Sequence, residues 1–191
     1  MAHPQVCVAV TGATMEELRR KRDAAEGADL VEMRLDWVDR PDAAAALDGR
    51  RRPVILTCRP TWEGGRFQGS EDARREILER AIGAGAEFVD VEARASFAAD
   101  LIRARRGRGV ILSSHIFGAI PDDLERRWQA LTSAGAEVAK LAVDAQSLSD
   151  TLRVMALADS VPDATGGDSD HVLIAMGHPG KIGRASCRER V

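Results

Sequence analysis

One lysine, Lys140, lies in a largely apolar stretch, AEVAKLAV, at residues 136–143. The chain has 27 lysines and arginines together, of which only Lys21, Lys140 and Lys181 are lysines. Arginine could serve in any ion pair, but only lysine can lose its proton and attack a carbonyl carbon to form an imine. Burial lowers the pKa of a lysine and favours the neutral amine. Lys140 is therefore the candidate nucleophile; the alternative is a lysine whose charged end reaches solvent at the end of a strand.

A histidine follows another apolar run. His115 comes directly after GVILSS at residues 109–114. An imidazole titrates near neutral pH, so it can accept a proton and return it, which makes His115 a candidate general acid and base. The alternative is a histidine that makes only a structural hydrogen bond.

Further charged residues lie at or just after the ends of neighbouring runs. Glu63 lies in RPTWEGGRFQG, where two glycines let the backbone fold closely enough for its carboxylate to hold His115. Glu32 and Arg34 alternate along one run, so they point to the same side of a strand, and Arg59 follows the next run. Arginine binds carboxylates and hydroxyls, and glutamate binds hydroxyls, so this group predicts an anion and diol site. The alternative is a ring of structural ion pairs.

Seven short apolar runs must position these side chains. Each is rich in Val, Ile and Leu and short enough for a buried parallel strand: residues 6–10, 28–35, 53–58, 87–92, 109–114, 137–143 and 171–176. The segments between them are typical of helices. Thr14 is the expected N-cap of a helix over 15–26 and Ser70 of a helix over 71–82. Two further helices are expected, one over 122–132 and one that starts at Ser147 or Ser149 and reaches residue 158.

This alternation indicates the α/β class. Without a glycine-rich phosphate-binding fingerprint, two architectures remain: a (β/α)8 TIM barrel and an open doubly wound sheet. The charged residues gather after the carboxyl ends of the runs, and in a barrel these ends face one mouth. The pattern therefore favours the barrel. Only seven strands are found, so we expect it to be truncated after strand 7.

Composition limits the partners. The net charge of −3 is small and its charges are interspersed, which argues against a nucleic-acid partner. No apolar run reaches the roughly 18 residues of a membrane span, and the N-terminus has no signal-peptide pattern. The three cysteines are far apart and include no C-x-x-C, so neither a disulfide framework nor a zinc site is indicated. We expect a cytoplasmic protein with reduced thiols.

Five motifs, in order, carry a family resemblance: VEMRLD, TCRPTWEGGRF, SSHIF, VAKLAV and IAMGHPG. Together they resemble the type I 3-dehydroquinate dehydratases, over about residues 5–180. The resemblance implies a (β/α)8 barrel that uses no metal or cofactor and acts on a small molecule, 3-dehydroquinate, in the shikimate pathway of aromatic amino acid biosynthesis. Members of the family often form homodimers, so a second copy of this chain is an expected partner.

The resemblance also implies roles for individual residues. Lys140 would form an imine with the ketone of the substrate, and His115 would remove a proton from the adjacent carbon and later protonate the departing hydroxyl. Glu63 matches the acid that pairs with this histidine. The remaining matches are to substrate-binding residues: Glu32, Arg34, Arg59, a pocket methionine at Met176 and a carboxylate-binding arginine at Arg184.

The sequence departs from the family pattern in two places. Ile116 stands where an aspartate usually follows the histidine. Residues 181–191, KIGRASCRERV, look like a translated sequencing adapter, so we expect an incomplete barrel domain at 1–180, without its last helix–strand–helix, and a non-native tail at 181–191. The match of Arg184 would then be a coincidence. Because an incomplete barrel exposes strand edges, we expect poor stability and weak or no activity.

Three other functions fit part of the pattern. A second kind of Schiff-base barrel lyase, such as a class I aldolase, would share Lys140 but would not need the Glu32, Arg34 and Arg59 group. A non-catalytic metabolite-binding relic is indicated by Ile116 and the altered C-terminal end. A metal-dependent isomerase is less favoured, because no metal-ligand spacing is present.

Overall fold

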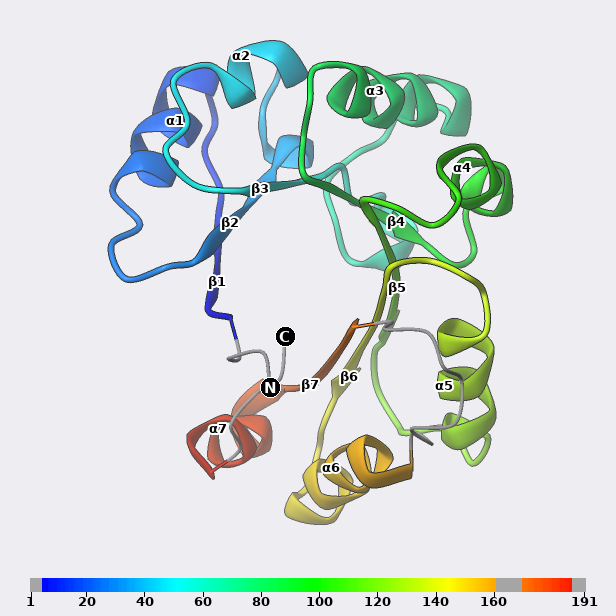
Figure 1. Ribbon diagram of the computed structural model, residues 1–191. Helices are drawn as coiled ribbons and strands as arrows, with labels where there is room; N and C mark the ends of the chain where they lie inside the picture. Colours follow the sequence, from blue (N-terminus) through cyan, green and yellow to red (C-terminus); the bar gives the residue numbers. More distant parts are fainter. Residues whose placement is uncertain (1–4, 161–169, 187–191) are drawn as a thin grey trace.

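Seven parallel strands form one curled sheet in the computed structural model, which describes residues 5–160 and 170–186 (Figure 1). Their spatial order follows the chain from β1 to β7, and every neighbouring pair is parallel. The strands are β1 (Cys7–Val10), β2 (Leu30–Arg34), β3 (Val54–Thr57), β4 (Phe88–Glu92), β5 (Val110–Ile116), β6 (Val138–Asp144) and β7 (Asp170–Met176). The predicted strands are confirmed, and the sequential order is that of a barrel wall rather than of a doubly wound sheet.

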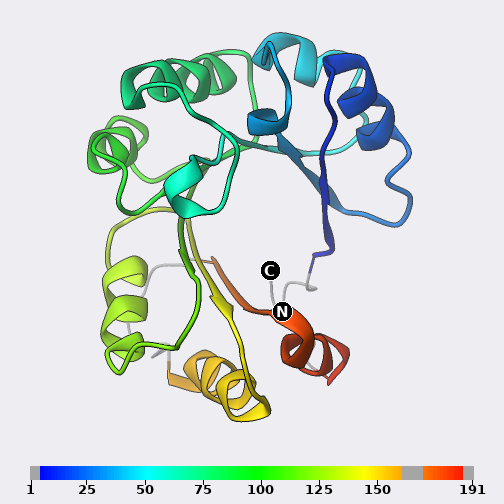
Figure 2. The ribbon, with the colours of Figure 1, turned by 180° about the vertical axis from the view of Figure 1, so that it is seen from behind.

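Helices follow the strands and cover the outer side of the curled sheet, as the two opposite views show (Figures 1 and 2). They are α1 (Met15–Asp23), α2 (Ala43–Leu47), α3 (Glu71–Gly83), α4 (Ala98–Arg105), α5 (Leu124–Thr132), α6 (Leu148–Ser160) and α7 (Gly177–Ser186). Two short 3-10 helices, η1 (Leu35–Trp37) and η2 (Thr61–Glu63), follow β2 and β3.

Three of the predicted helix starts are confirmed by their caps. The fourth differs: α5 begins at Leu124 rather than at residue 122, and Asp123 before it makes no side-chain capping hydrogen bond. Thr14 Oγ1 accepts a hydrogen bond from the backbone of Glu17 at 3.2 Å, and Ser70 Oγ accepts one from Ala73 at 3.2 Å. Ser147 is the cap of α6, since its Oγ accepts from Asp150 N at 3.2 Å. These bonds satisfy backbone N–H groups that would otherwise lack partners in the first helical turn.

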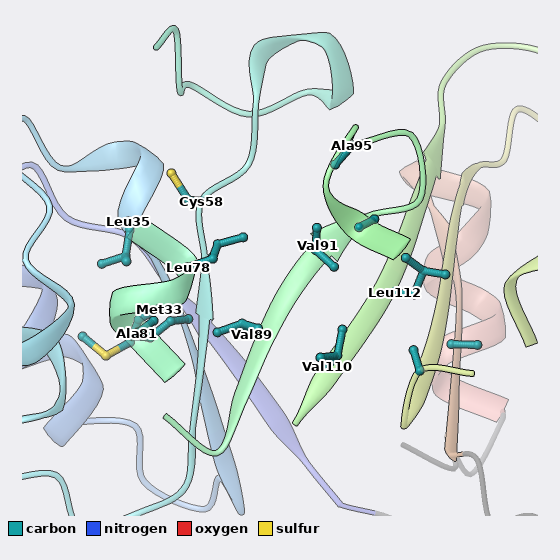
Figure 3. Packing of buried hydrophobic residues seen from close by; sticks show 14 of the residues in the cluster. Met33, Leu35, Cys58, Leu78, Ala81, Val89, Val91, Ala95, Val110 and Leu112 are labelled. Atoms are coloured by element: carbon teal, nitrogen blue, oxygen red, sulfur yellow. The ribbon is translucent and has the colours of Figure 1, made fainter. Parts of the chain in front are cut away.

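The two faces of the sheet bury different residues. On the outer face, Met33 and Val89 pack with Leu78 and Ala81 of α3, and all four are fully buried (Figure 3). The inner face carries a separate apolar cluster of four strand residues, namely Leu30, Ile55, Ile111 and Val138. Side chains alternate along a strand, so the residues two positions further on also point inward. These inward residues are polar: Glu32, Thr57, Ser113 and Lys140.

The sheet ends at β1 and β7, each of which has one strand neighbour within the described residues. Residues 181–186 continue α7 as a helix. Residues 187–191 lie outside the described part of the chain, so the non-native origin of the tail stays a prediction. The same holds for the expected poor stability. In the described ranges, no helix has both the length and the apolar character needed to cross a bilayer.

Candidate active site

Lys140 lies on the inner face of β6 and is held by two carboxylates. Its Nζ is 2.9 Å from Asp90 Oδ2 and 3.3 Å from Glu32 Oε2, and its side chain is 12% exposed. Burial favours loss of the ammonium proton, but the negative charges of Asp90 and Glu32 outweigh it, so the pKa of Lys140 is raised. The expectation that burial leaves this amine neutral is therefore wrong for the free site.

Both carboxylates beside Lys140 remain ionised. Burial opposes the charge on Asp90, but Arg59 and Lys140 outweigh it and hold the pKa of Asp90 well below its usual range. The balance for Glu32 is the same in kind: burial opposes ionisation, and the ammonium of Lys140 contributes most to lowering its pKa. Glu32 Oε1 also accepts a hydrogen bond from Thr57 Oγ1 at 2.8 Å, which fixes the carboxylate toward the lysine.

Asp90 was not among the residues expected at the site. It lies in EFVDVE, a run assigned to a buried strand, and its neighbours Val89 and Val91 point outward into the core. The available signal was the alternation of Asp90 with Glu92, which mirrors that of Glu32 with Arg34 on β2. Two acids spaced by one residue on a strand point to the same side, so this pattern could have placed Asp90 on the inner face.

Arg59 lies at the centre of a buried ion-pair network. Its Nη2 is 2.9 Å from Asp90 Oδ1, and its Nη1 is 2.6 Å from Glu92 Oε1 and 2.7 Å from Ser113 Oγ. Glu92 also pairs with Arg74 of α3, which is fully buried. The structural ion-pair ring considered above is thus present around Arg59, and the binding of substrate by Arg59 stays a prediction.

His115 and Glu63 are brought together as expected. Glu63 Oε1 accepts a hydrogen bond from the backbone N–H of His115 at 2.8 Å and lies 3.1 Å from the ring Nδ1. Burial lowers the pKa of His115, and the contact with Glu63 opposes this only in part. A neutral imidazole is the form that can act as a base. Along β5, His115 is two residues beyond Ser113, which is in register with Lys140.

The loop that carries Glu63 depends on its two glycines. Gly64 ends η2 with a φ of +77°, in the left-handed region that glycine adopts easily. At Gly65 a Cβ would lie 2.0 Å from the carbonyl oxygen of Arg59, so the backbone approaches too closely for any side chain. Figure 2 shows this segment in teal, next to β5. The expectation that these glycines allow Glu63 to reach His115 agrees with this geometry.

The other substrate-binding candidates lie at the same end of the sheet or in the helix that follows β7. Arg34 ends β2 and is bound to Asp36 through Nε and Nη2, both at 2.8 Å. Met176 ends β7, opposite Asp144 of β6. The backbone of Arg184 belongs to α7, but its side chain lies outside the described residues. Within the described part of the chain, no group of three or more His, Cys, Asp or Glu side chains could hold a metal ion.

Comparison with known proteins identifies the family. The sequence model described as type I 3-dehydroquinase matches residues 6–189, nearly the whole chain. The chain belongs to the type I 3-dehydroquinase family. Among curated relatives, the 3-dehydroquinate dehydratase of Desulfotalea psychrophila is 33% identical over 190 residues, which are 96% of this chain and 83% of that protein. The bifunctional 3-dehydroquinate dehydratase/shikimate dehydrogenase of Arabidopsis thaliana chloroplasts is 30% identical, over 95% of this chain and 31% of that protein.

Solved structures agree with this family fold. The 3-dehydroquinate dehydratase of Enterococcus faecalis superposes with a TM-score of 0.84 at 24% identity, over 96% of this chain and 84% of that one. A putative deoxyribose-phosphate aldolase from Coccidioides immitis reaches a TM-score of 0.55 at 17% identity, a likeness of fold alone. The predicted α/β barrel of a type I 3-dehydroquinase is confirmed, with seven strands in the described residues.

Proposed function

We propose that this chain dehydrates 3-dehydroquinate to 3-dehydroshikimate through an imine at Lys140, in the shikimate pathway that leads to the aromatic amino acids. The observation that supports this best is the neighbourhood of Lys140. Its amine lies between Asp90 and Glu32 on the inner face of the sheet. The neighbouring strand β5 carries His115, which contacts Glu63. This is the set of groups that imine-based elimination requires: an amine, a base and a group that orients the base.

In the proposed reaction, the neutral amine of Lys140 attacks the ketone carbon to give a carbinolamine. The proton that the Lys140 ammonium gave up returns to the carbinolamine hydroxyl, which leaves as water to give a protonated imine. The positive charge acidifies the adjacent carbon, from which neutral His115 takes a proton to leave an enamine. His115 then returns a proton to the departing hydroxyl, which leaves as water while the enamine electrons form the new double bond. Hydrolysis of the imine consumes a water and releases 3-dehydroshikimate, so one water is lost overall.

Lys140 must lose a proton before it attacks, because its pKa is raised in the free site. We assign this step to substrate binding. A substrate hydroxyl that donates to Glu32 would weaken the ion pair between Glu32 and Lys140, which is one of the two that stabilise the ammonium. The amine would then become neutral only when the ketone is next to it.

The remaining residues have proposed roles in substrate binding. Glu32 would hold a substrate hydroxyl, and Arg34 and Arg59 would hold hydroxyls or the carboxylate. Met176 would line the site, and Arg184 would hold the carboxylate if residues 181–191 are native. We also propose a cytoplasmic location, which is supported by the free thiols of Cys7 and Cys58. A homodimer stays a prediction.

Borohydride trapping tests the proposal. The protein is mixed with 3-dehydroquinate and borohydride, which reduces an imine to a stable amine, and is then analysed by intact mass and peptide mapping. We expect one adduct, on Lys140, in the wild type and in the control K21R, and none in K140M. An adduct on Lys21 would contradict the proposal. Because weak activity is expected of an incomplete barrel, a wild type without an adduct is tested again with an eighth βα unit restored, and no adduct there would also contradict the proposal. A conjugated enone product, rather than cleavage fragments, distinguishes dehydration from aldolase chemistry.

A further inference from the structure

Asp36, in η1 directly after β2, is a buried carboxylate that four N–H groups approach. Its side chain has no exposed surface. Oδ1 accepts from Arg34 Nε at 2.8 Å and from the backbone N–H of Arg59 at 3.2 Å. Oδ2 accepts from Arg34 Nη2 at 2.8 Å and from the backbone N–H of Arg66 at 3.1 Å. Each carboxylate oxygen therefore binds one guanidinium N–H and one backbone N–H.

The two backbone donors lie at the two ends of the loop that carries Glu63. This loop, residues 59–67, is closed on itself: the N–H of Phe67 donates to Arg59 O at 3.1 Å, and the N–H of Thr61 donates to Phe67 O at 3.1 Å. At its far end, the guanidinium of Arg66 stacks on the ring of Trp37, with 3.3 Å from Cζ to the ring centroid. The loop is thus a small closed unit that is attached to η1 at both ends through Asp36 and Trp37.

This attachment joins two groups that the proposed reaction needs. Both oxygens of Asp36 bind the guanidinium of Arg34, a candidate for substrate binding. The same two oxygens also bind the backbone at the two ends of the loop that carries Glu63. From this loop, Glu63 reaches His115, with Glu63 Oε1 at 2.8 Å from the backbone nitrogen of His115. We propose that Asp36 is a positioning residue that fixes Arg34 and the Glu63–His115 pair relative to one another. This role rests on the proposed dehydratase function, although the contacts themselves do not.

A carboxylate is the side chain that fits this place. Four N–H donors require acceptor lone pairs on both oxygens, and an ionised aspartate offers only acceptors. In D36N, one of the two positions would carry an NH2 group, which would face a guanidinium N–H and a backbone N–H. At least two of the four hydrogen bonds would then be lost, on Arg34 and on one end of the loop.

Steady-state kinetics of D36N give the first test, with D39N as the control, since Asp39 is exposed and only three residues away. We expect D36N to raise KM about ten-fold through Arg34. We expect it also to lower kcat about 100-fold through displacement of Glu63 and His115, because catalytic groups moved by about 1 Å lose this much. D39N should match the wild type. A change in KM alone, as R34M would give, would overturn the double role.

Amide hydrogen exchange gives a second test that needs no activity. The N–H groups of His115 and Arg66 should exchange faster in D36N, while the N–H of Leu141 in β6 keeps its protection. Equal acceleration at all three would mean general destabilisation, and unchanged protection at His115 would mean that Asp36 does not hold the loop; either result overturns the proposal. If D36N does not fold, D36E is measured instead, with the same local loss of protection expected from its displaced oxygens. If the wild type does not dehydrate 3-dehydroquinate, the proposed function fails, but the exchange test of Asp36 still stands.

Discussion

One oxygen of Glu63 binds His115 at two points, the backbone N–H at 2.8 Å and the ring Nδ1 at 3.1 Å. A carboxylate only accepts hydrogen bonds, so the neutral ring must carry its proton on Nδ1 and leave Nε2 free to act as the base. Contact with the backbone as well as the ring fixes both the position of the residue and the direction of its imidazole. Glu63 therefore sets the tautomer of His115.

We expect E63Q to change the pH profile of the reaction. Glu63 raises the pKa of His115 against the effect of burial, so its removal lowers this pKa further. The acid limb of kcat/KM, where His115 becomes protonated, should move to lower pH, and kcat should fall about 100-fold because the base is weaker and less well oriented. The control is E76Q, on the exposed face of α3. A shift of the acid limb to higher pH would contradict the role of Glu63.

We expect E32Q to make Lys140 more reactive toward a small aldehyde. Loss of the Glu32 charge removes one of the two ion pairs that raise the pKa of Lys140, so a larger fraction of the amine is neutral at a given pH. One neighbouring charge shifts a pKa by about one unit or more, which corresponds to at least about a ten-fold gain. Reductive methylation with formaldehyde and cyanoborohydride, followed by peptide mapping, measures it.

Lys21 supplies the reference in the same digest. It pairs with Glu17 at 2.7 Å on the surface of α1, so E32Q should not change its labelling. In the wild type, labelling of Lys140 should rise with pH as its ammonium loses its proton. Unchanged or slower labelling of Lys140 in E32Q would show that Glu32 does not stabilise the ammonium.

The strands and their order could be predicted from the sequence because buried parallel strands form short runs of Val, Ile and Leu, separated by capped helices. Thr14 and Ser70 marked helix starts through a local hydrogen bond, which sequence alone encodes. The short helices α2 and α4 were not bounded individually. Phe97, which precedes α4, makes no side-chain capping hydrogen bond that would mark the helix start. Helix α2 is only five residues long, which is too short for apolar residues to recur at helical spacing.

The site was predicted less completely, because several of its properties depend on contacts between distant strands. Lys140, His115 and Glu63 could be selected one by one from residue type and position. The raised pKa of Lys140 could not be predicted in this way, because it depends on Asp90, which is 50 residues away in the sequence. Spacing alone also could not reveal that Arg59 is enclosed by Glu92, Asp90 and Ser113.

The buried pair between Arg74 and Glu92 gives a prediction about stability. Arg74 has no exposed side-chain surface, and its guanidinium also lies over Phe97, with 5.0 Å from Cζ to the ring centroid. R74M should lower the free energy of unfolding by about 3–5 kcal/mol, because removal of one partner leaves part of a buried charge without compensation. The control R80M breaks an exposed pair with Glu76 on the same helix and should cost less than about 1 kcal/mol. Urea unfolding measures both, and equal effects would show that Arg74 is not essential to the network.

We expect G65A to reduce activity through the position of Glu63. Its Cβ would lie 2.0 Å from the carbonyl oxygen of Arg59, which is backbone and cannot rotate away, so the loop must shift and carry Glu63 with it. A displacement of about 1 Å should lower kcat about 100-fold, and the forced contact should lower stability by about 1–3 kcal/mol. The matched control is G83A, where a Cβ would meet nothing within 4 Å at the end of α3, and where alanine should stabilise the helix by about 0.5–1 kcal/mol. Turnover and thermal melting of both variants provide the comparison. If G65A retained the kcat of the wild type, the closed loop could not be what holds Glu63 against His115.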